Sequence, residues 1–310
     1  MGYPKRAALA LPFARWELPG WGKLLRAAGV YDNDRWHDAP HRAVRGKFHG
    51  YRMRLNLANW SERQTFFLAR YYDLPTQLFL RAALAPGETL IDAGGNIGMI
   101  SLLGSHLVGP AGRVITFEPN PDAAARIRQF VADNAIANIT LHQAGLSDTP
   151  GQFTLSVITA HTGMGTLAEP EPDQQGLVSV RHTVDVRRGD DLTGPDLAGP
   201  AVIKMDVEGY ECRAMRGFAA TIARLKPAIV TEVSDHHLRR AGSSARELFD
   251  LLHAHGYQSY DLGVRRRILG LGNRPTLTPL DAPRPDHEGD VGWLIPGTVH
   301  EARLARFIRR

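Results

Sequence analysis

One segment, LIDAGGNIG at residues 90–98, restricts the fold of this chain more than any other part of its sequence. An apolar, strand-like run ends at Asp92, glycines follow at positions 94, 95 and 98, and a helical apolar pattern begins at Ile97. Glycine allows the backbone to approach a ligand closely, and the first turn of a helix presents free N–H groups. The segment therefore predicts a strand–turn–helix unit with a ligand site at the turn.

The same strand–helix alternation continues along the chain and predicts an α/β fold. Strand-like apolar runs occupy residues 89–93, 113–117, 139–143, 201–206 and 228–233, and helical patterns lie between them near 97–107, 121–135 and 210–223. Short apolar strands that alternate with amphipathic helices are typical of a parallel sheet covered on both faces. Later strands near 257–262 and 292–295 would complete a Rossmann-like, mostly parallel seven-stranded sheet.

Two further regions interrupt or precede this pattern. The alternating segments 152–157 and 177–186 predict an inserted β-hairpin, and the glycines and prolines of 159–176 predict a loop between its strands. Residues 1–60 lack the α/β alternation, so we expect a separate N-terminal extension that contacts an acceptor or a second copy in a homodimer. Residues 61–310 would then form the main domain.

Composition excludes several classes of protein. Hydrophobic residues make up 43% of the 310 residues, which suits a sizeable buried core. The one cysteine, Cys212, cannot form a disulfide or a cysteine-built metal site within the chain, and we expect it to be a buried helix residue. The sequence contains no good signal peptide and no apolar run long enough to span a membrane, so we expect a cytoplasmic protein.

The net charge is +5, and arginines cluster at 265–267 and near the C-terminus. A basic chain can bind nucleic acid, phospholipid or a phosphate-bearing substrate. These clusters are not interleaved with aromatic residues in a known nucleic-acid motif, so we expect mild basicity without a nucleic-acid partner.

Two acidic residues at strand ends indicate the ligand of the glycine turn. Asp92 can accept a hydrogen bond from a ligand ammonium group, while the helix N-terminus can bind a carboxylate. Glu118, at the end of the next strand, can accept from two ribose hydroxyls. A nucleoside that carries an amino acid satisfies both acids, and S-adenosylmethionine (SAM) is such a cofactor. A dinucleotide would require G-x-G-x-x-G, but Asn96 occupies the place of the second glycine.

Five segments occur in an order that resembles the FkbM-type methyltransferase family: LIDAGGNIG, VITFEPNP, HQAGLSD, VIKMDVEGYE and AIVTEVSD. The resemblance covers roughly residues 70–262 and implies a class I methyltransferase fold with SAM as cofactor. It also implies, as in many members, methylation of hydroxyl groups on sugars or natural products. Ala93-Gly94-Gly95 replaces the more usual Val-Gly-Ala, a minor departure. The cofactor-binding residues that we expect are Asp92, Gly94, Gly95, Asn96, Gly98, Glu118, Pro119, Leu146 and Ser147.

Within that set, the resemblance assigns Asp92, Gly94 and Gly98 to the methionine part of SAM and Glu118 to the ribose. The segment 144–148 is expected beside the adenine.

The candidates for acceptor chemistry are Lys204, Asp206, Glu208 and Glu232. A methyl transfer from SAM requires the protein to align the acceptor and to remove its proton. Lys204 lies in an apolar strand, where an unpaired charge is costly, so we expect a carboxylate partner. A purely structural Lys204–Asp206 ion pair is the alternative to a catalytic Asp206. Glu208 could equally complement the dipole of the following helix, at whose start we expect it.

Asp206 and Glu232 are expected side by side at the ends of neighbouring strands. There they could orient a hydroxyl, share a proton or hold a divalent ion. We expect no metal, with an ion at Asp206 and Glu232 as the alternative. His236 and His237 could provide a base, but we expect solvated loop histidines.

The sequence favours O-methylation of a hydroxyl on a sugar or glycan-type acceptor. One alternative is O- or N-methylation of a polyketide or another small natural product. An alternative of a different class is a nucleic-acid-binding protein or an RNA methyltransferase. The chain lacks the Asn/Asp-Pro-Pro-Tyr/Phe motif of common enzymes that methylate amino groups of bases, which argues against that class.

Overall fold

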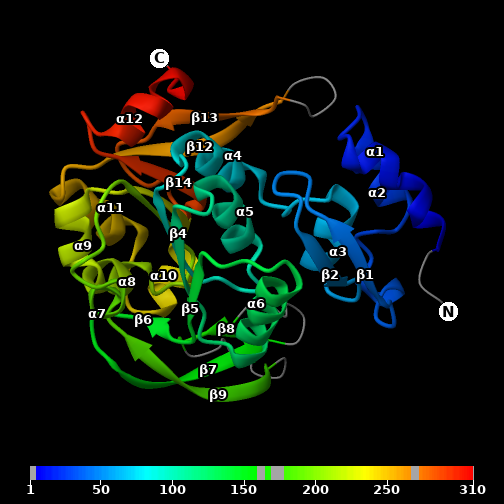
Figure 1. Cartoon of the computed structure of the whole chain (residues 1–310), viewed down its shortest axis with the longest axis horizontal. Helices are drawn as coiled ribbons and strands as arrows, with labels where there is room; N and C mark the ends of the chain where they lie inside the picture. Colours follow the sequence, from blue (N-terminus) through cyan, green and yellow to red (C-terminus); the bar gives the residue numbers. More distant parts are fainter. Residues whose placement is uncertain (1–4, 159–164, 169–177, 267–271, 310) are drawn as a thin grey trace.

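The computed structural model describes residues 5–158, 165–168, 178–266 and 272–309. Its centre is an eight-stranded sheet in the order β13-β12-β14-β11-β10-β3-β4-β5 (Figure 1). The five adjacent strands from β11 to β5 are parallel, β14 runs antiparallel to β11 and β12, and β13 runs antiparallel to β12. The strands are β3 (Thr89–Ala93), β4 (Arg113–Phe117), β5 (Ile139–His142), β10 (Ala201–Met205), β11 (Ala228–Ser234), β12 (Gln258–Arg265), β13 (Arg274–Pro279) and β14 (Glu288–Leu294).

Successive strand residues enter two different cores because the side-chain period of a strand is two. Leu90 of β3 packs in the core on one face of the sheet and Ile91 in the core on the other. The helices of the Leu90 face are α4 (Leu74–Ala83), α5 (Met99–Val108) and α12 (Val299–Leu304). Those of the Ile91 face are α8 (Glu211–Gly217), α9 (Ala219–Leu225), α10 (Asp235–Arg240) and α11 (Ala245–Ala254). Burial of both faces explains the nearly continuous apolar runs in the parallel strands.

The Rossmann-like class I arrangement is confirmed, but the count of seven strands was wrong. The additional strand is β13, whose sequence RPTLTP contains prolines at positions 275 and 279. Proline weakens a strand pattern and is tolerated in a sheet only at an edge, which is where β13 lies. The helix expected over 210–223 is also two helices, α8 and α9, which meet at the buried Phe218. Cys212 is fully buried in α8, as expected.

The inserted hairpin is confirmed as part of a four-stranded sheet. Its strands are β7 (Gly151–Ile158) and β9 (Val178–Arg187), which pair antiparallel. The short strands β6 (Gly145–Leu146) and β8 (Gly165–Thr166) pair with β9 and β7 respectively. Most of the loop expected at 159–176 lies outside the described residues. The remaining helical segments of the main domain are α6 (Pro121–Asp133), α7 (Gly189–Thr193) and the 3-10 turn η4 (Ala305–Phe307).

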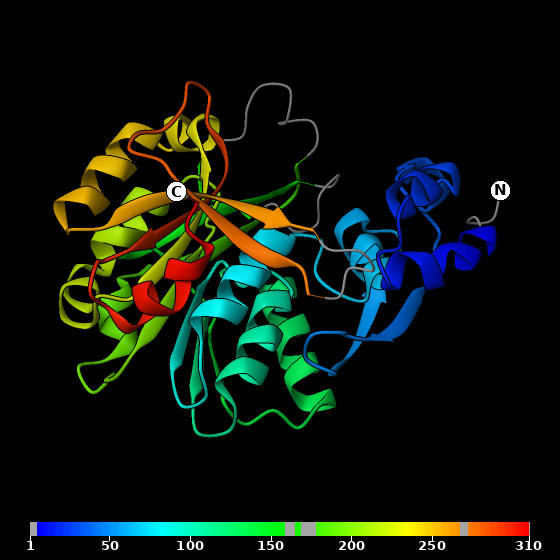
Figure 2. The ribbon, with the colours of Figure 1, turned by 90° about the horizontal axis from the view of Figure 1, so that it is seen from above.

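The N-terminal extension lies to one side of the sheet, as Figures 1 and 2 show. It contains η1 (Lys5–Ala10), α1 (Leu11–Arg15), α2 (Trp21–Ala27), η2 (Asn33–Arg35), and the hairpin of β1 (His41–Arg45) and β2 (Arg52–Asn56). α3 (Trp60–Leu68) packs against α1 and β2. Its Arg63 is fully buried and donates hydrogen bonds to the carbonyl oxygens of Val30 and Leu57. The extension therefore has its own core, and α3 belongs to it.

Arg303, in the C-terminal arginine cluster, lies in α12 and donates to Glu88 and to the Ala83 carbonyl. Arg303 therefore has a structural role at the C-terminal end of α4. Within the described ranges, no helix has both the length and the apolar character needed to cross a membrane.

Candidate functional site

The glycine turn after β3 brings the ends of two strands into direct contact. Gly94 has φ of +80°, and a Cβ atom at this position would lie 1.7 Å from the carbonyl oxygen of Asp206. Gly98 has φ of +89° and begins α5. Asn96 adopts φ of +47°, which is uncommon for a residue other than glycine. A side chain at position 94 would therefore separate β3 from β10. The turn of residues 94–98, which we name the cradle, is thus free of obstructing side chains beside Asp206.

Glu118 closes the cradle from the side of β4. Its Oε2 accepts from the backbone N–H of Asn96 at 2.6 Å, and its Oε1 accepts from that of Asn120 at 2.8 Å. Burial raises the pKa of Glu118 to about 7, although both N–H bonds oppose this shift. An ionised carboxylate has about four acceptor positions, so two remain for ligand hydroxyls. The geometry fits the ribose role that the resemblance implies.

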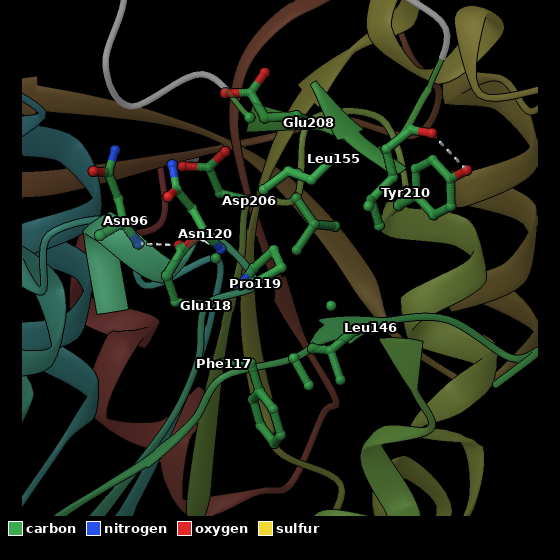
Figure 3. Close-up of a pocket in the computed structure, with 17 residues that line it drawn as sticks. Asn96, Phe117, Glu118, Pro119, Asn120, Leu146, Leu155, Asp206, Glu208 and Tyr210 are labelled. Carbon is green, nitrogen blue, oxygen red and sulfur yellow. Dashed lines mark hydrogen bonds between the residues drawn. The ribbon is translucent and has the colours of Figure 1, made fainter. Parts of the chain in front are cut away.

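The cradle opens into a pocket. Figure 3 shows that its two ends differ: Asp206 and Glu208 lie at one end, and Phe117 and Leu146 at the other. Glu118 lies between them, beside Asn96. A ligand with a charged part and a flat aromatic part suits such a pocket, and SAM has both.

Four of the nine expected cofactor residues do not line this pocket, namely Asp92, Gly95, Gly98 and Ser147. Asp92 is fully buried beneath it and accepts a hydrogen bond from Ser101 Oγ at 2.5 Å. Ser147 is also fully buried, and its hydroxyl donates to Asp148, while the neighbouring Leu146 does line the pocket. Gly95 borders an adjoining recess together with Lys204 and Asp206. Their roles in binding the cofactor remain predictions.

Lys204 connects the glycine turn to the acidic residues. Its Nζ donates to the carbonyl oxygen of Gly94 at 2.7 Å and lies 3.3 Å from Asp206 Oδ2 and 3.7 Å from Asp92 Oδ1. The expected carboxylate partner of Lys204 is thus confirmed. Burial lowers the pKa of Lys204, but the carboxylates of Asp206 and Asp92 outweigh it and hold that pKa above its ordinary value. The ammonium therefore stays charged.

A second cavity adjoins the first at Asp206, and we name it the acidic cavity. Its walls carry the carboxyl groups of Asp206, Glu232, Asp73 and Asp290 and the rings of Tyr71 and Tyr72. The two rings are in contact, with centroids 4.5 Å apart. The acidic cavity therefore offers several carboxyl groups and an aromatic wall next to the cofactor pocket.

The carboxyl groups of the acidic cavity interact strongly. Asp206 and, next, burial raise the pKa of Glu232 to about 10, with further contributions from Glu208 and Asp290. Burial and the neighbouring Asp73 hold the pKa of Asp290 well above its ordinary value, and these two side chains are hydrogen-bonded. Glu232 therefore carries a proton at neutral pH and can donate a hydrogen bond, and the pKa of Asp290 is raised in the same direction.

Asp290 and Asp73 are not among the site residues expected from the sequence. Asp290 lies on the antiparallel strand β14, far along the chain from every recognised motif. Asp73 is the N-cap of α4, and its side chain accepts from the N–H of Thr76. Its position before Leu74-Pro75 is a normal helix-start pattern, so only the fold shows that it also reaches the cavity.

Two expectations near the acids were wrong. His237 does not lie in a solvated loop, because residues 235–240 form α10; its side chain is 21% exposed, and its Nδ1 lies 3.3 Å from Glu208 Oε2. Glu208 is not in the following helix but in the turn before it, with φ of +54°. Glu211 begins that helix and accepts from the N–H groups of Val207 and Gly209, which fixes the turn.

Oxygen atoms of Glu208 and Glu232 and a ring nitrogen of His237 lie within 4.8 Å of one another. Among the described residues this is the group whose spacing could hold a metal ion. It differs from the sequence-based alternative, because His237 and Glu208 take the place expected for Asp206.

A family model described as the methyltransferase FkbM domain matches residues 92–259, more than half of the chain. The chain belongs to the FkbM methyltransferase family. It is a SAM-dependent methyltransferase, and the match includes the cradle, Glu118 and all four acceptor-side candidates.

Three relatives illustrate the range of the similarity. The chain is 29% identical over 184 residues to Methyltransferase 1 of Beauveria bassiana, covering 54% of this chain and 71% of the relative. It is 30% identical over 146 residues to the hexuronic acid methyltransferase AglP of Haloferax volcanii, covering 46% and 55% respectively. It is 27% identical over 178 residues to the 2-O-methyltransferase NoeI of Sinorhizobium fredii, covering 54% and 72%.

A solved structure of a methyltransferase FkbM from Methylobacillus flagellatus aligns with 93% of this chain at 18% identity and a TM-score of 0.40. The alignment spans 59% of that protein.

We predict that Glu118→Ala weakens binding of S-adenosylhomocysteine by about 1–3 kcal/mol, the scale of hydrogen bonds to a charged group. Isothermal titration calorimetry would measure the change. Asp122→Ala, an exposed residue in the first turn of α6, is the matched control and should bind as the wild type does. Wild-type affinity in a folded Glu118→Ala variant would contradict the assignment of the ribose to Glu118.

We predict that this FkbM methyltransferase keeps full turnover in EDTA, because Lys204 already neutralises Asp206 and because protons neutralise Glu232. The test compares initial rates with and without the chelator, followed by addition of Mg²⁺ or Mn²⁺. Loss of activity in EDTA with recovery on addition of either ion would instead assign an ion to Glu208, Glu232 and His237.

Proposed function

We propose that this enzyme methylates a hydroxyl group of a sugar-type acceptor held in the acidic cavity. The observation that carries the proposal is the position of Asp206, which lines both the cofactor pocket and the acidic cavity. An acceptor hydroxyl at Asp206 would lie next to the polar end of the cofactor pocket. Asp73, Glu232 and Asp290 provide further acceptors and donors for other hydroxyls of the same molecule.

The mixture of ionised and protonated carboxyl groups suits an acceptor with several hydroxyls. A hydroxyl both donates and accepts a hydrogen bond, so it pairs with an ionised carboxylate on one side and a protonated carboxyl on the other. The Tyr71–Tyr72 pair gives this cavity a flat apolar wall for a ring. Two relatives have names in accord with such an acceptor, since one acts on a hexuronic acid and the other at a 2-O position.

SAM supplies an activated methyl group, so the chain itself needs no nucleophile. In our proposal Asp206 accepts the proton of the acceptor hydroxyl or orients that hydroxyl for in-line attack. The Nζ atom of Lys204 lies 3.3 Å from Asp206 Oδ2, and this ion pair positions the carboxyl group. Glu232, protonated at neutral pH, donates to a neighbouring acceptor oxygen. General base assistance of this kind contributes about 100- to 10,000-fold to the rate.

An acceptor panel tests the class of substrate. We predict methyl transfer from radiolabelled SAM to sugars with free hydroxyl groups, in a product that survives mild alkali. Alkali stability matters because a methyl ether resists hydrolysis whereas a methyl ester on a uronic acid carboxylate does not. Transfer to aromatic or polyketide alcohols but to no sugar would contradict the sugar proposal, and alkali-labile label would contradict an ether product.

We predict that Asp206→Asn lowers kcat by at least about 100-fold and changes S-adenosylhomocysteine binding little. The substitution keeps the shape of the side chain and removes its charge, while Glu118 and the cradle remain. Single-turnover rates, calorimetry and the melting temperature together test this. In the structural alternative, the Lys204–Asp206 pair only stabilises the fold, and lost activity would follow lost folded protein. Near wild-type turnover in a stable variant would exclude the catalytic role.

A further inference from the structure

A third concave surface lies between the N-terminal extension and the main domain, and it has the opposite charge. We name it the basic groove; it shares no lining residue with the cofactor pocket or the acidic cavity. Four cationic side chains line it, from α1, the β1–β2 hairpin and α4: Arg15, Arg45, Lys47 and Arg81.

Most of this positive charge is uncompensated. Lys47 pairs with Glu17 at 2.6 Å. Across the described part of the chain, no carboxylate forms an ion pair with Arg15, Arg45 or Arg81. Glu17 is in addition bound by Arg70, so its single negative charge is shared between two cations. Cations in a concave surface concentrate positive potential and attract anions.

The cationic side chains are held in place before any ligand arrives. The guanidinium of Arg81 lies 4.4 Å from the centre of the Phe48 ring, and that of Arg15 lies 5.6 Å from the centre of the Phe66 ring. Arg45 donates to the carbonyl oxygen of Gly50 at 3.1 Å. Fixing these side chains beforehand reduces the entropy lost when they bind a ligand.

The groove also contains an exposed aromatic surface. Trp16 is 56% exposed, although a large aromatic side chain is usually buried. A flat ring beside several cations suits an organic molecule that carries an anion better than a bare inorganic ion. Three guanidinium groups exceed the charge of one carboxylate and match a phosphate or diphosphate, which arginine binds through paired N–H donors.

We propose that the basic groove binds the phosphate or diphosphate group of a phosphorylated organic ligand. The groove and the acidic cavity lie on neighbouring parts of the chain. Ala69 lines the groove and Tyr71 lines the cavity, and residues two apart have Cα atoms within about 7 Å. Arg70, between them, binds Glu17 and donates to the carbonyl oxygens of Tyr71 and Tyr72. Phosphate binding in the groove does not depend on which acceptor is methylated.

The test is calorimetric titration of inorganic pyrophosphate into the whole protein. A variant with both Arg45→Ala and Arg81→Ala should bind pyrophosphate at least about tenfold more weakly than the wild type, since it loses two charged donors. The matched control is Arg113→Ala with Arg187→Ala, which removes the same charge from exposed positions outside the groove. It should change pyrophosphate affinity less than about twofold. Unchanged S-adenosylhomocysteine binding in both variants would show that the main domain is intact.

Three outcomes would overturn the proposal. One is a wild type that does not bind pyrophosphate at millimolar concentration, and another is equal loss in the groove variant and the control. The third distinguishes a lipid surface from a small phosphorylated ligand. If vesicles of equal parts phosphatidylglycerol and phosphatidylcholine bind the wild type but not the groove variant, and pyrophosphate binds neither, the groove contacts anionic lipid instead. None of these results depends on the sugar acceptor, so the proposed function is tested separately.

Discussion

The buried ammonium group of Lys204 is the interaction on which the site depends. It donates to the Gly94 carbonyl and lies within ion-pair distance of Asp92 and Asp206, which belong to different strand ends. Without it, Asp92 and Asp206 would lie close together with no cation between them. They lie this close because Gly94 has no Cβ atom, which lets the turn pack against Asp206. A buried lysine is normally costly, but here its charge stabilises the acids and its hydrogen bond fixes the cradle. Cofactor geometry and acceptor chemistry therefore share one positioning residue.

The acidic cavity follows from a similar balance. Lys204 lies beside Asp206, whereas burial and acidic neighbours raise the pKa values of Glu232 and Asp290. A cavity with so many carboxyl groups is stable because only some of them are ionised. In the proposed function, a hydroxylated acceptor can form hydrogen bonds with both kinds of carboxyl group.

Local sequence patterns were sufficient to predict the core strands, but they did not predict which residues surround Glu208 and Glu232. The strands at 89–93 and 113–117 were predicted residue for residue, because both faces of the sheet are buried and the apolar runs are short and clearly bounded. β13 was missed because its prolines hide a strand that exists only as a sheet edge. Asp290 and His237 were missed as site residues because their roles depend on strand order and on α10, which bring them to Glu232 and Glu208. The spacing of these residues in the sequence does not indicate that they lie close together in the fold.

The acidic cavity and the basic groove carry opposite charge and lie on either side of residues 69–72. In the two proposals above, the cavity binds a hydroxyl-rich acceptor and the groove binds phosphate. Glu17 and Arg70 lie between them as a buried ion pair, and Arg70 also holds the backbone of the two tyrosines that form the aromatic wall. The N-terminal extension therefore contacts the wall of the acidic cavity through the Glu17–Arg70 pair, even though none of the cavity's carboxyl groups belongs to the extension.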